Sequence, residues 1–440
     1  MNKTFFLIPL LTISILLSLT NCGGGSSNRE PRVVEDSLTV APTPVIKPIV
    51  VNVFIDNSVS MRGYVPTLGA RAFTDIVHDY LAGIERAANA LNIWFISETP
   101  FDTIPSSATA QNIRDYLRPA RFGGNDSDMA AMLERALPTA PNEVSIFITD
   151  GIFSPGGASR RYADQYLRDQ QIRIRETMIG RLSRLPNTAV AVYQFYSLFY
   201  GRIWNAMPSY AWARNVERPF YIWLIGDAEN VYRIKSGTAD SFNRAIENVF
   251  TLFPSVEKEV NYTILMNPRL GHFEQDRRRG VPQPSIRRMR AQRGGGAHAG
   301  RFMFTTGVDF SPFDAMIQSG YLTNDYLTNV ENYVLRISNQ PTALFDMVIA
   351  NSPATDNTHT HHISLTTERI TTGELQISLQ RKRTQVPQWV FDITDSDGRA
   401  LNDNTRRQTF GLKYMVRGVH EAFQEHGDAI YTTIKLNLNR

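Results

Sequence analysis

The sequence predicts an α/β fold in which a doubly wound, mostly parallel sheet is followed by a smaller β-rich, sandwich-like domain. From Ile49 to about residue 270, short apolar runs alternate with stretches whose apolar residues repeat at helical spacing, which is typical of alternating strands and helices. Beyond residue 301, shorter runs with period-two patterning are separated by polar loops, which favours antiparallel sheets. A chain of 440 residues with 42% hydrophobic residues can form one large core or two ordinary ones.

Residues 1–21 are expected to be a signal peptide. Lys3 precedes an apolar run over residues 5–19, which is too short to span a bilayer comfortably. The run continues as Leu19-Thr20-Asn21-Cys22, followed by Gly and Ser. This order resembles the lipobox of bacterial lipoproteins. An ordinary secretory signal is the alternative, since Asn21 stands where the lipobox usually has Gly, Ala or Ser.

The lipobox resemblance implies that Cys22, the one cysteine of the chain, becomes the first mature residue and carries the lipid. Several acyl chains would anchor the protein stably to a membrane of the bacterial cell envelope. Gly23 rather than Asp follows the cysteine, which favours the outer membrane. Residues 22–47 are rich in Gly, Ser, Pro and charge, and we expect a flexible tether there.

Residues 48–270 are expected to form the α/β domain. Residues 49–55 are apolar and β-branched, as in a buried parallel strand. Helical spacing is clearest for Phe73, Val77, Leu81 and Ile84. The strands predicted on these grounds cover residues 49–55, 93–96, 144–148, 189–200 and 219–225, and the helices cover residues 73–91, 111–117, 129–137, 160–185 and 241–253.

Three polar clusters follow these elements. Asp56, Ser58 and Ser60 come directly after the first strand, a Gly-Gly turn precedes Ser127 at the start of a helix, and Asp150 follows the strand over residues 144–148. Ligand sites of doubly wound sheets lie at the carboxyl ends of the strands, so these clusters are expected to meet. The alternative is that the two aspartates only cap helices or turns.

The three clusters together resemble the von Willebrand factor A domain, a Rossmann-like fold with a metal-ion-dependent adhesion site. That site uses a D-x-S-x-S loop, matched here by Asp56, Ser58 and Ser60, then a distant Thr and a distant Asp, matched by Asp150. Ser127 best meets the spacing of the Thr position, and Asn125 is the competing candidate. The resemblance covers about residues 48–270.

The donor chemistry of this constellation favours Mg²⁺ or Mn²⁺. Two carboxylates and three hydroxyls are hard oxygen ligands, whereas zinc would prefer His or Cys. The resemblance implies that Ser58, Ser60 and Ser127 coordinate the ion directly or nearly so, while Asp56 and Asp150 act largely through water. One coordination position would remain for a carboxylate of a partner protein.

Residues 271–301 carry most of the positive charge. The segment has eight arginines against Glu274 and Asp276, a local net charge of +6 in a chain whose total is +4. We expect an Arg/Gly-rich loop that is solvated, with binding to anionic envelope polymer or lipid headgroups as the alternative. Nucleic acid is not an expected partner, because an exported protein does not meet RNA routinely and Phe or Tyr does not alternate with these arginines. The candidate residues are Arg277, Arg278, Arg279, Arg287, Arg288, Arg290 and Arg293.

Residues 302–440 are expected to form the β-rich domain, with a late helix over residues 409–424. The predicted strands cover residues 333–337, 343–350, 363–367, 375–380, 389–393 and 430–438. His359, His361 and His362 could ligate a transition metal, because alternate residues of a strand share a face. Their polar surroundings, with Asp356 as the nearby carboxylate, favour histidines of a loop.

These features predict a membrane-tethered, metal-dependent binding module that is not an enzyme. Its role would be adhesion or envelope assembly, and its partner would be a protein that offers an acidic side chain. The alternative is a metal-assisted hydrolase, such as a phosphoesterase that uses Ser58 or Ser60 as nucleophile. Such an enzyme would want a base or a second metal nearby, and the histidines cluster far downstream.

Overall fold

The computed structural model describes most of the chain beyond the predicted tether. The described residues are 48–66, 72–96, 102–103, 108–124, 128–155, 162–204, 211–237, 240–276, 283–396 and 407–439. The predicted signal peptide and tether, with Cys22, lie outside them. So do the candidate ligands Asn125 and Ser127, and the candidate residues Arg277, Arg278 and Arg279.

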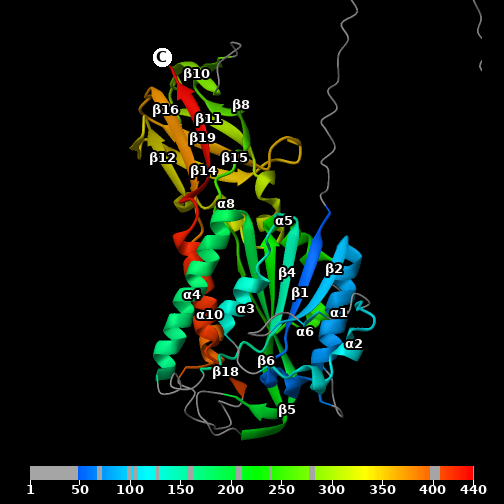
Figure 1. Cartoon of the computed structure of the whole chain (residues 1–440). Helices are drawn as coiled ribbons and strands as arrows, with labels where there is room; N and C mark the ends of the chain where they lie inside the picture. The colour runs from blue at the N-terminus through cyan, green and yellow to red at the C-terminus, as the bar shows by residue number, and fades with distance from the viewer. Residues whose placement is uncertain are drawn as a thin grey trace, which may run out of the picture. The chain divides into compact units, whose positions relative to one another are not determined.

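A seven-stranded sheet forms the first part of the fold (Figure 1). Its strand order is β3-β2-β1-β4-β6-β5-β7. The predicted parallel pairing holds for β1 with β2 and for β1 with β4, whereas β3, β6, β5 and β7 join by antiparallel pairs. The sheet is therefore mixed. Its strands are β1 (Val50–Asp56), β2 (Ala90–Ile96), β3 (Asp102–Thr103), β4 (Glu143–Thr149), β5 (Thr188–Ile203), β6 (Ala211–Asp227) and β7 (Asn248–Leu252).

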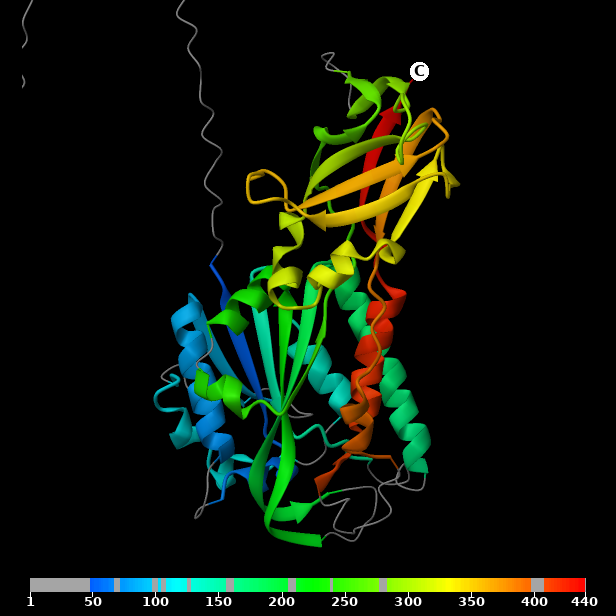
Figure 2. The same ribbon diagram turned by 180° about the vertical axis from the view of Figure 1, so that it is seen from behind.

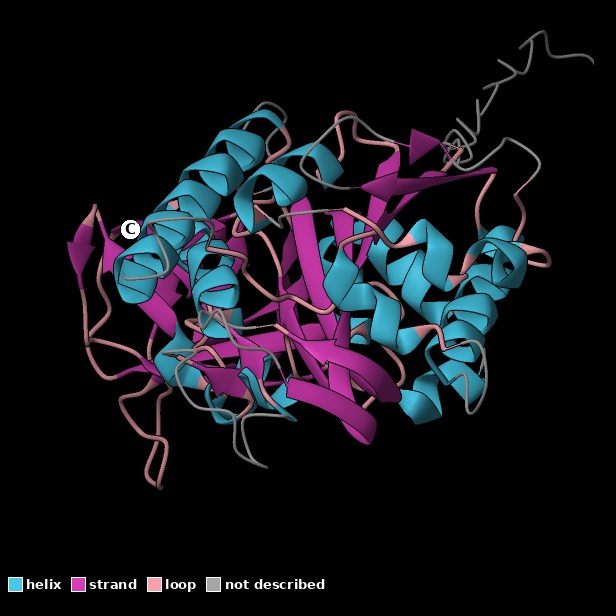
Figure 3. Ribbon diagram, turned by 60° about the horizontal axis from the view of Figure 1, so that its bottom comes forward, coloured by secondary structure: helices cyan, strands magenta, loops and turns pink. Residues whose placement is uncertain are grey.

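Helices cover both faces of this sheet, as Figure 3 shows. Buried side chains of β1 and β4 alternate between two clusters, so that Val53 and Ile146 face α1 (Ala72–Ala87) and α5 (Ala228–Ser236). Phe54 and Phe147 face the other side, where α3 (Met129–Ala136) and α4 (Ala163–Arg184) lie. The shorter helices are η1 (Val59–Tyr64), α2 (Ile113–Tyr116), η2 (Pro119–Arg121) and α6 (Asp240–Ala245).

Two further sheets form a β-rich part. A four-stranded sheet has the order β14-β15-β11-β8, and a six-stranded sheet has the order β13-β12-β16-β19-β10-β9. Their inner side chains, such as Ile363 and Ile377, belong to one buried cluster. The strands are β8 (Asn261–Leu270), β9 (His272–Gln275), β10 (Ser285–Arg290), β11 (Phe302–Asp309), β12 (Tyr333–Ile337), β13 (Gln340–Pro341), β14 (Asp346–Asn351), β15 (His361–Thr367), β16 (Gly373–Gln380) and β19 (Ile430–Leu438).

The remaining elements connect these sheets or return to the first part. The helix α10 (Leu412–Glu425) packs along α4, and Figures 1 and 2 show the two side by side. Its apolar face, including Met415 and Val419, completes the cluster around Phe54 and Phe147. The short elements are η4 (Ser311–Phe313), α7 (Asp314–Gln318), α8 (Asn324–Thr328), η5 (Val330–Asn332), α9 (Gln388–Asp392), β17 (Thr394–Asp395) and β18 (Thr409–Phe410).

The structure corrects three sequence predictions. The expected loop at residues 271–301 contains β9 and β10, which pair with each other and extend the six-stranded sheet. The expected helix at residues 241–253 ends at Ala245. Residues 248–252 instead form β7, which pairs with β5 at the edge of the sheet. The expected strand at residues 389–393 lies mostly within the short helix α9, which begins after Pro387 and buries Val390.

The predicted boundary between two domains is crossed in both directions. The strand β8 precedes residue 271 but pairs with β11, and α10 follows residue 302 but packs on α4. Residues Lys47–Arg440 form one compact unit. Across the described ranges, no helix combines the length and the apolar composition needed to span a membrane.

Candidate metal centre

Four of the predicted ligands are brought together at the carboxyl ends of β1 and β4. We refer to Asp56, Ser58, Ser60 and Asp150 as the Asp56–Asp150 centre. The strands are parallel neighbours, so Asp56 at the end of β1 and Asp150 after β4 emerge at the same sheet edge. All four side chains are buried, with exposed fractions between 0% and 7%.

Hydrogen bonds hold the loop after β1 in place. The backbone N–H of Ser58 donates to Oδ1 of Asp56 at 2.8 Å, and the hydroxyls of Ser58 and Ser60 lie 2.9 Å apart. Ser58 immediately precedes η1, whose tight turn brings Ser60 back to the same side. The loop therefore presents one carboxylate and two hydroxyls together.

The Gly123-Gly124 turn lies against this loop. Gly124 forms a parallel bridge with Ser58, and its backbone exchanges hydrogen bonds of 3.1 Å with Asn57 and Val59. The bridge fixes the chain immediately before residues 125–127, which hold both candidates for the remaining ligand. Asp128, the first described residue after them, caps α3 by accepting from the N–H of Ala131 at 3.0 Å.

Two side chains outside the predicted ligand set, Thr149 and Arg218, support the centre. The hydroxyl of Thr149 donates to Oδ2 of Asp56 at 2.7 Å. The buried Arg218 of β6 lies over the ring of Phe199 at 5.4 Å, and its positive charge opposes the rise that burial causes in the pKa of Asp150. Both could have been recognised in the sequence, because Thr149 directly precedes Asp150 and Arg218 is a charged residue beside a long apolar run.

The two carboxyl groups have raised pKa values. Burial, together with the charge of Asp150, raises the pKa of Asp56 to about 7. Burial also raises the pKa of Asp150, while Ser60 and Arg218 act in the opposite direction. Oδ1 of Asp150 accepts the N–H of Ile152 at 3.1 Å, and its buried Oδ2 has no hydrogen-bond partner among the described residues.

These observations fit a hard divalent cation. Buried carboxylates that repel each other favour protons or a cation, and an unpartnered carboxylate oxygen offers a ligand position. The donors are carboxylate and hydroxyl oxygens, the set preferred by Mg²⁺ and Mn²⁺. The residues present can therefore hold such an ion in place of protons.

A pocket of about 710 Å³ is lined in part by Val59, the residue between Ser58 and Ser60 of the centre. We call it the aromatic pocket, since it contains Tyr200 and Trp212, whose rings lie 6.2 Å apart and are 46% and 55% exposed. Arg62 lines it from η1 and donates to the backbone oxygen of Phe122 at 3.0 Å. The full lining is Val59, Arg62, Gly63, Pro66, Pro119, Tyr200, Gly201, Arg202, Trp212 and Asn215.

The described arginines of the basic segment lie around β10. Arg287 and Arg288 pair with Glu274 of β9 at 3.4 Å and 2.9 Å, while Arg290 and Arg293 are exposed. The ion pairs neutralise part of the local charge. Binding of an anionic surface by this segment stays a prediction.

No family model matches this sequence, and no match to it was found among curated proteins or solved structures.

Proposed function

We propose that this chain is a membrane-tethered, divalent-metal-dependent protein-binding module of the bacterial cell envelope. In this account the Asp56–Asp150 centre holds Mg²⁺ or Mn²⁺, and the ion accepts an acidic side chain of a partner protein. The observation that carries the proposal is the pair of buried carboxyl groups at the ends of adjacent parallel strands, with Oδ2 of Asp150 unpartnered among the described residues.

The arrangement of β2, β1 and β4 also supports the proposal. These three strands are parallel and have helices on both faces, and β1 and β4 place the acidic loops at their carboxyl ends, as a doubly wound von Willebrand factor A domain would. β6 differs, since it runs antiparallel beside β4. We propose the resemblance for the part that supplies the metal ligands.

The aromatic pocket supports a protein partner. Its lining includes Val59, which stands between the two candidate serine ligands in the sequence, together with Arg62 and Trp212. Exposed aromatic and arginine side chains are enriched where proteins bind one another. A partner segment with an acidic residue beside an apolar one would match the ion and the pocket together.

The proposed membrane tether depends on Cys22. Lipidation of this residue would leave residues 23–47 as a linker between the anchor and the described part of the chain. The predicted location is a lipid-anchored position in the envelope, with the outer membrane favoured. Metabolic labelling with a palmitate analogue tests this step, since a Cys22→Ser variant should lose the label.

A capture experiment tests the binding function. The full chain is immobilised and exposed to solubilised native membranes in Mg²⁺, in EDTA, and in EDTA followed by excess Mg²⁺. We expect a reproducible partner that is retained with Mg²⁺, lost with EDTA and regained when Mg²⁺ returns. Asp150→Asn should lose this partner, whereas Asp115→Asn, a change on the exposed surface, should keep it.

Two results would contradict this function. Partner capture that is unchanged by chelation and by Asp150→Asn would exclude a metal-dependent contact. Turnover of a generic phosphoester that disappears in Ser60→Ala would instead support the hydrolase alternative.

A further inference from the structure

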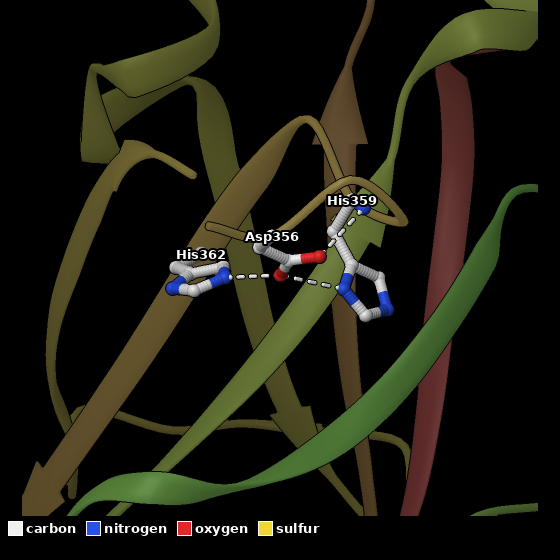
Figure 4. Close-up of side chains that lie close together, drawn as sticks. All are labelled: Asp356, His359 and His362. Carbon is white, nitrogen blue, oxygen red and sulfur yellow. Dashed lines mark hydrogen bonds and ion pairs between the residues drawn. The ribbon is translucent and has the colours of Figure 1, made fainter. Parts of the chain in front are cut away.

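Asp356, His359 and His362 form a convergent group, which we call the histidine cluster. Nδ1 of His359 and Nε2 of His362 each donate to Oδ2 of Asp356, at 2.8 Å and 2.7 Å (Figure 4). The side chains are only 8% to 15% exposed. Among the described residues, these three were found to have ligand atoms close enough together to share a metal ion, all within 4.8 Å of one another.

The carboxylate of Asp356 is held in a fixed orientation. Its Oδ1 accepts the backbone N–H groups of Thr358 and His359 at 2.9 Å and 3.2 Å, which leaves Oδ2 facing the imidazoles. The loop that carries it is closed at its base, since the N–H of Ser352 donates to the oxygen of Thr360 at 2.9 Å. The cluster is therefore pre-organised by its own backbone.

The outer face of the four-stranded sheet forms the floor of the cluster. Thr263 of β8, Gly307 of β11 and His362 of β15 lie in one row across three paired strands. The ring of His359 lies over this row. A Cβ added at Gly307 would come within 2.6 Å of that ring, so the absence of a side chain there creates the space that His359 occupies.

The second ring nitrogen of His359 also has a partner. Its Nε2 lies 2.9 Å from the hydroxyl of Thr263. Histidines that bind metals almost always use their other nitrogen in this way, which fixes the tautomer and the ring plane. His361 is not part of the cluster, since it is buried on the opposite face of β15 against Phe310.

We propose that the histidine cluster is a binding site for a divalent transition metal ion, with Zn²⁺ as the expected occupant. Two imidazoles and a carboxylate, with the fourth position open to water, form a known zinc donor set. This site lies apart from the Asp56–Asp150 centre in the fold and does not depend on the proposed partner binding. It differs from that centre because imidazole nitrogen favours zinc over Mg²⁺.

Metal binding requires a defined exchange of protons. Nδ1 of His359 and Nε2 of His362 must give up the protons that they donate to Asp356, so that each presents a lone pair to the ion. A singly protonated ring moves its proton to the other nitrogen, and a doubly protonated ring releases one proton to solvent. In His359 the other nitrogen is Nε2, whose proton the hydroxyl of Thr263 can accept. Zinc bonds of about 2.0 Å place tetrahedral ligands about 3.3 Å apart, so each of the two nitrogens needs to move about half an ångström away from Oδ2 of Asp356.

Metal titration of the full chain tests the site. The protein is stripped with a chelator, returned to excess Mg²⁺ so that the Asp56–Asp150 centre is supplied, and titrated with Zn²⁺ in a calorimeter. We expect one high-affinity Zn²⁺ per chain beyond any weak binding. Co²⁺ bound at the same site should give visible absorption bands that disappear when Zn²⁺ is added.

Matched variants locate the bound ion. His362→Gln should weaken Zn²⁺ binding by more than the roughly 10- to 100-fold that loss of an outer partner costs, and Thr263→Val should weaken it by about 10-fold. Thr263 is exposed, so its variant keeps the test valid if His362→Gln does not fold. His298→Gln, in an exposed turn, is the histidine control. Failure of the parent to bind Zn²⁺, or equal binding by all four proteins, would overturn the proposal.

Discussion

The hydroxyl of Thr149 donates a 2.7 Å hydrogen bond to Oδ2 of Asp56 and so joins the last residues of β4 and β1. The same oxygen of Thr149 accepts the N–H of Gly151 at 2.9 Å. One buried hydroxyl thus fixes a candidate ligand and the backbone after Asp150. Thr149→Val should lower the free energy of unfolding by about 1–3 kcal/mol, because a buried carboxylate and an N–H lose a partner.

Thr149→Ser is the matched control for this prediction. It keeps the hydroxyl and should retain most of the stability and the Mg²⁺ response. Urea denaturation of the three proteins measures the difference. Retained stability in Thr149→Val, together with a loss in Thr149→Ser, would mean that the methyl group and not the hydrogen bond stabilises this contact.

Neutralising one carboxylate should remove the repulsion and also the metal site. In Asp150→Asn, the metal-free protein should be at least as stable as the parent, because Asp56 no longer faces a second buried acid. Mg²⁺ should raise the melting temperature of the parent but leave that of the variant nearly unchanged. Thermal denaturation with and without Mg²⁺ measures both effects, with Asp115→Asn as a surface control. An unchanged Mg²⁺ response in Asp150→Asn would exclude this residue as a ligand.

The raised pKa of Asp56 predicts a pH dependence for the metal-free protein. Between pH 4 and pH 7 the unfolded chain releases this proton, since the ordinary pKa is 3.8, while the folded chain retains it up to about pH 7. The unfolded state then binds fewer protons, so the stability that Asp56 contributes falls as pH rises through this range, by at most about 4 kcal/mol. Excess Mg²⁺ should reduce the fall because the ion replaces the proton.

Asp56→Asn isolates that contribution. The difference in unfolding free energy between the parent and this variant should change with pH in metal-free buffer and level off above pH 7. Urea denaturation at a series of pH values gives this difference. A difference that is constant from pH 4 to pH 7 would show that the pKa of Asp56 is not raised.

Close packing at Gly63 couples η1 to β5. A Cβ added at Gly63 would lie 2.3 Å from the ring of Phe199, so Gly63→Ala must displace one of the two elements. We expect a loss of about 1–3 kcal/mol in stability and a reshaped aromatic pocket. Gly180→Ala in α4 meets nothing within 4 Å and should be neutral or stabilising. Equal unfolding free energies for the two variants would contradict this packing.

Much of the first sheet could be predicted from local pattern. β1 and β4 are short apolar runs whose parallel pairing follows from alternation with helices, and the loop at Asp56 was identified by its residue spacing. The strand order beyond β4 was not predictable in this way. β5 and β6 form a long antiparallel pair, and their local sequence patterns do not determine which of them lies beside β4.

The supporting contacts of both metal sites depend on tertiary structure. Thr149 reaches Asp56 because β1 and β4 are adjacent. Thr263 reaches His359 because β8 pairs with β11. The histidines were expected in a loop, yet His361 and His362 begin β15 and only His359 precedes the strand. Local sequence showed the cluster of histidines but not the row of Thr263 and Gly307 beneath it.

Calorimetric titration of Mg²⁺ into the chelator-treated full chain measures whether the Asp56–Asp150 centre holds a metal ion. We expect one Mg²⁺ to bind per chain, Asp56→Ala and Asp150→Asn to abolish this binding, and His362→Gln to leave it unchanged. Absence of Mg²⁺ and Mn²⁺ binding by the folded parent, or equal binding by the Asp56→Ala variant, would contradict a metal centre at these strand ends.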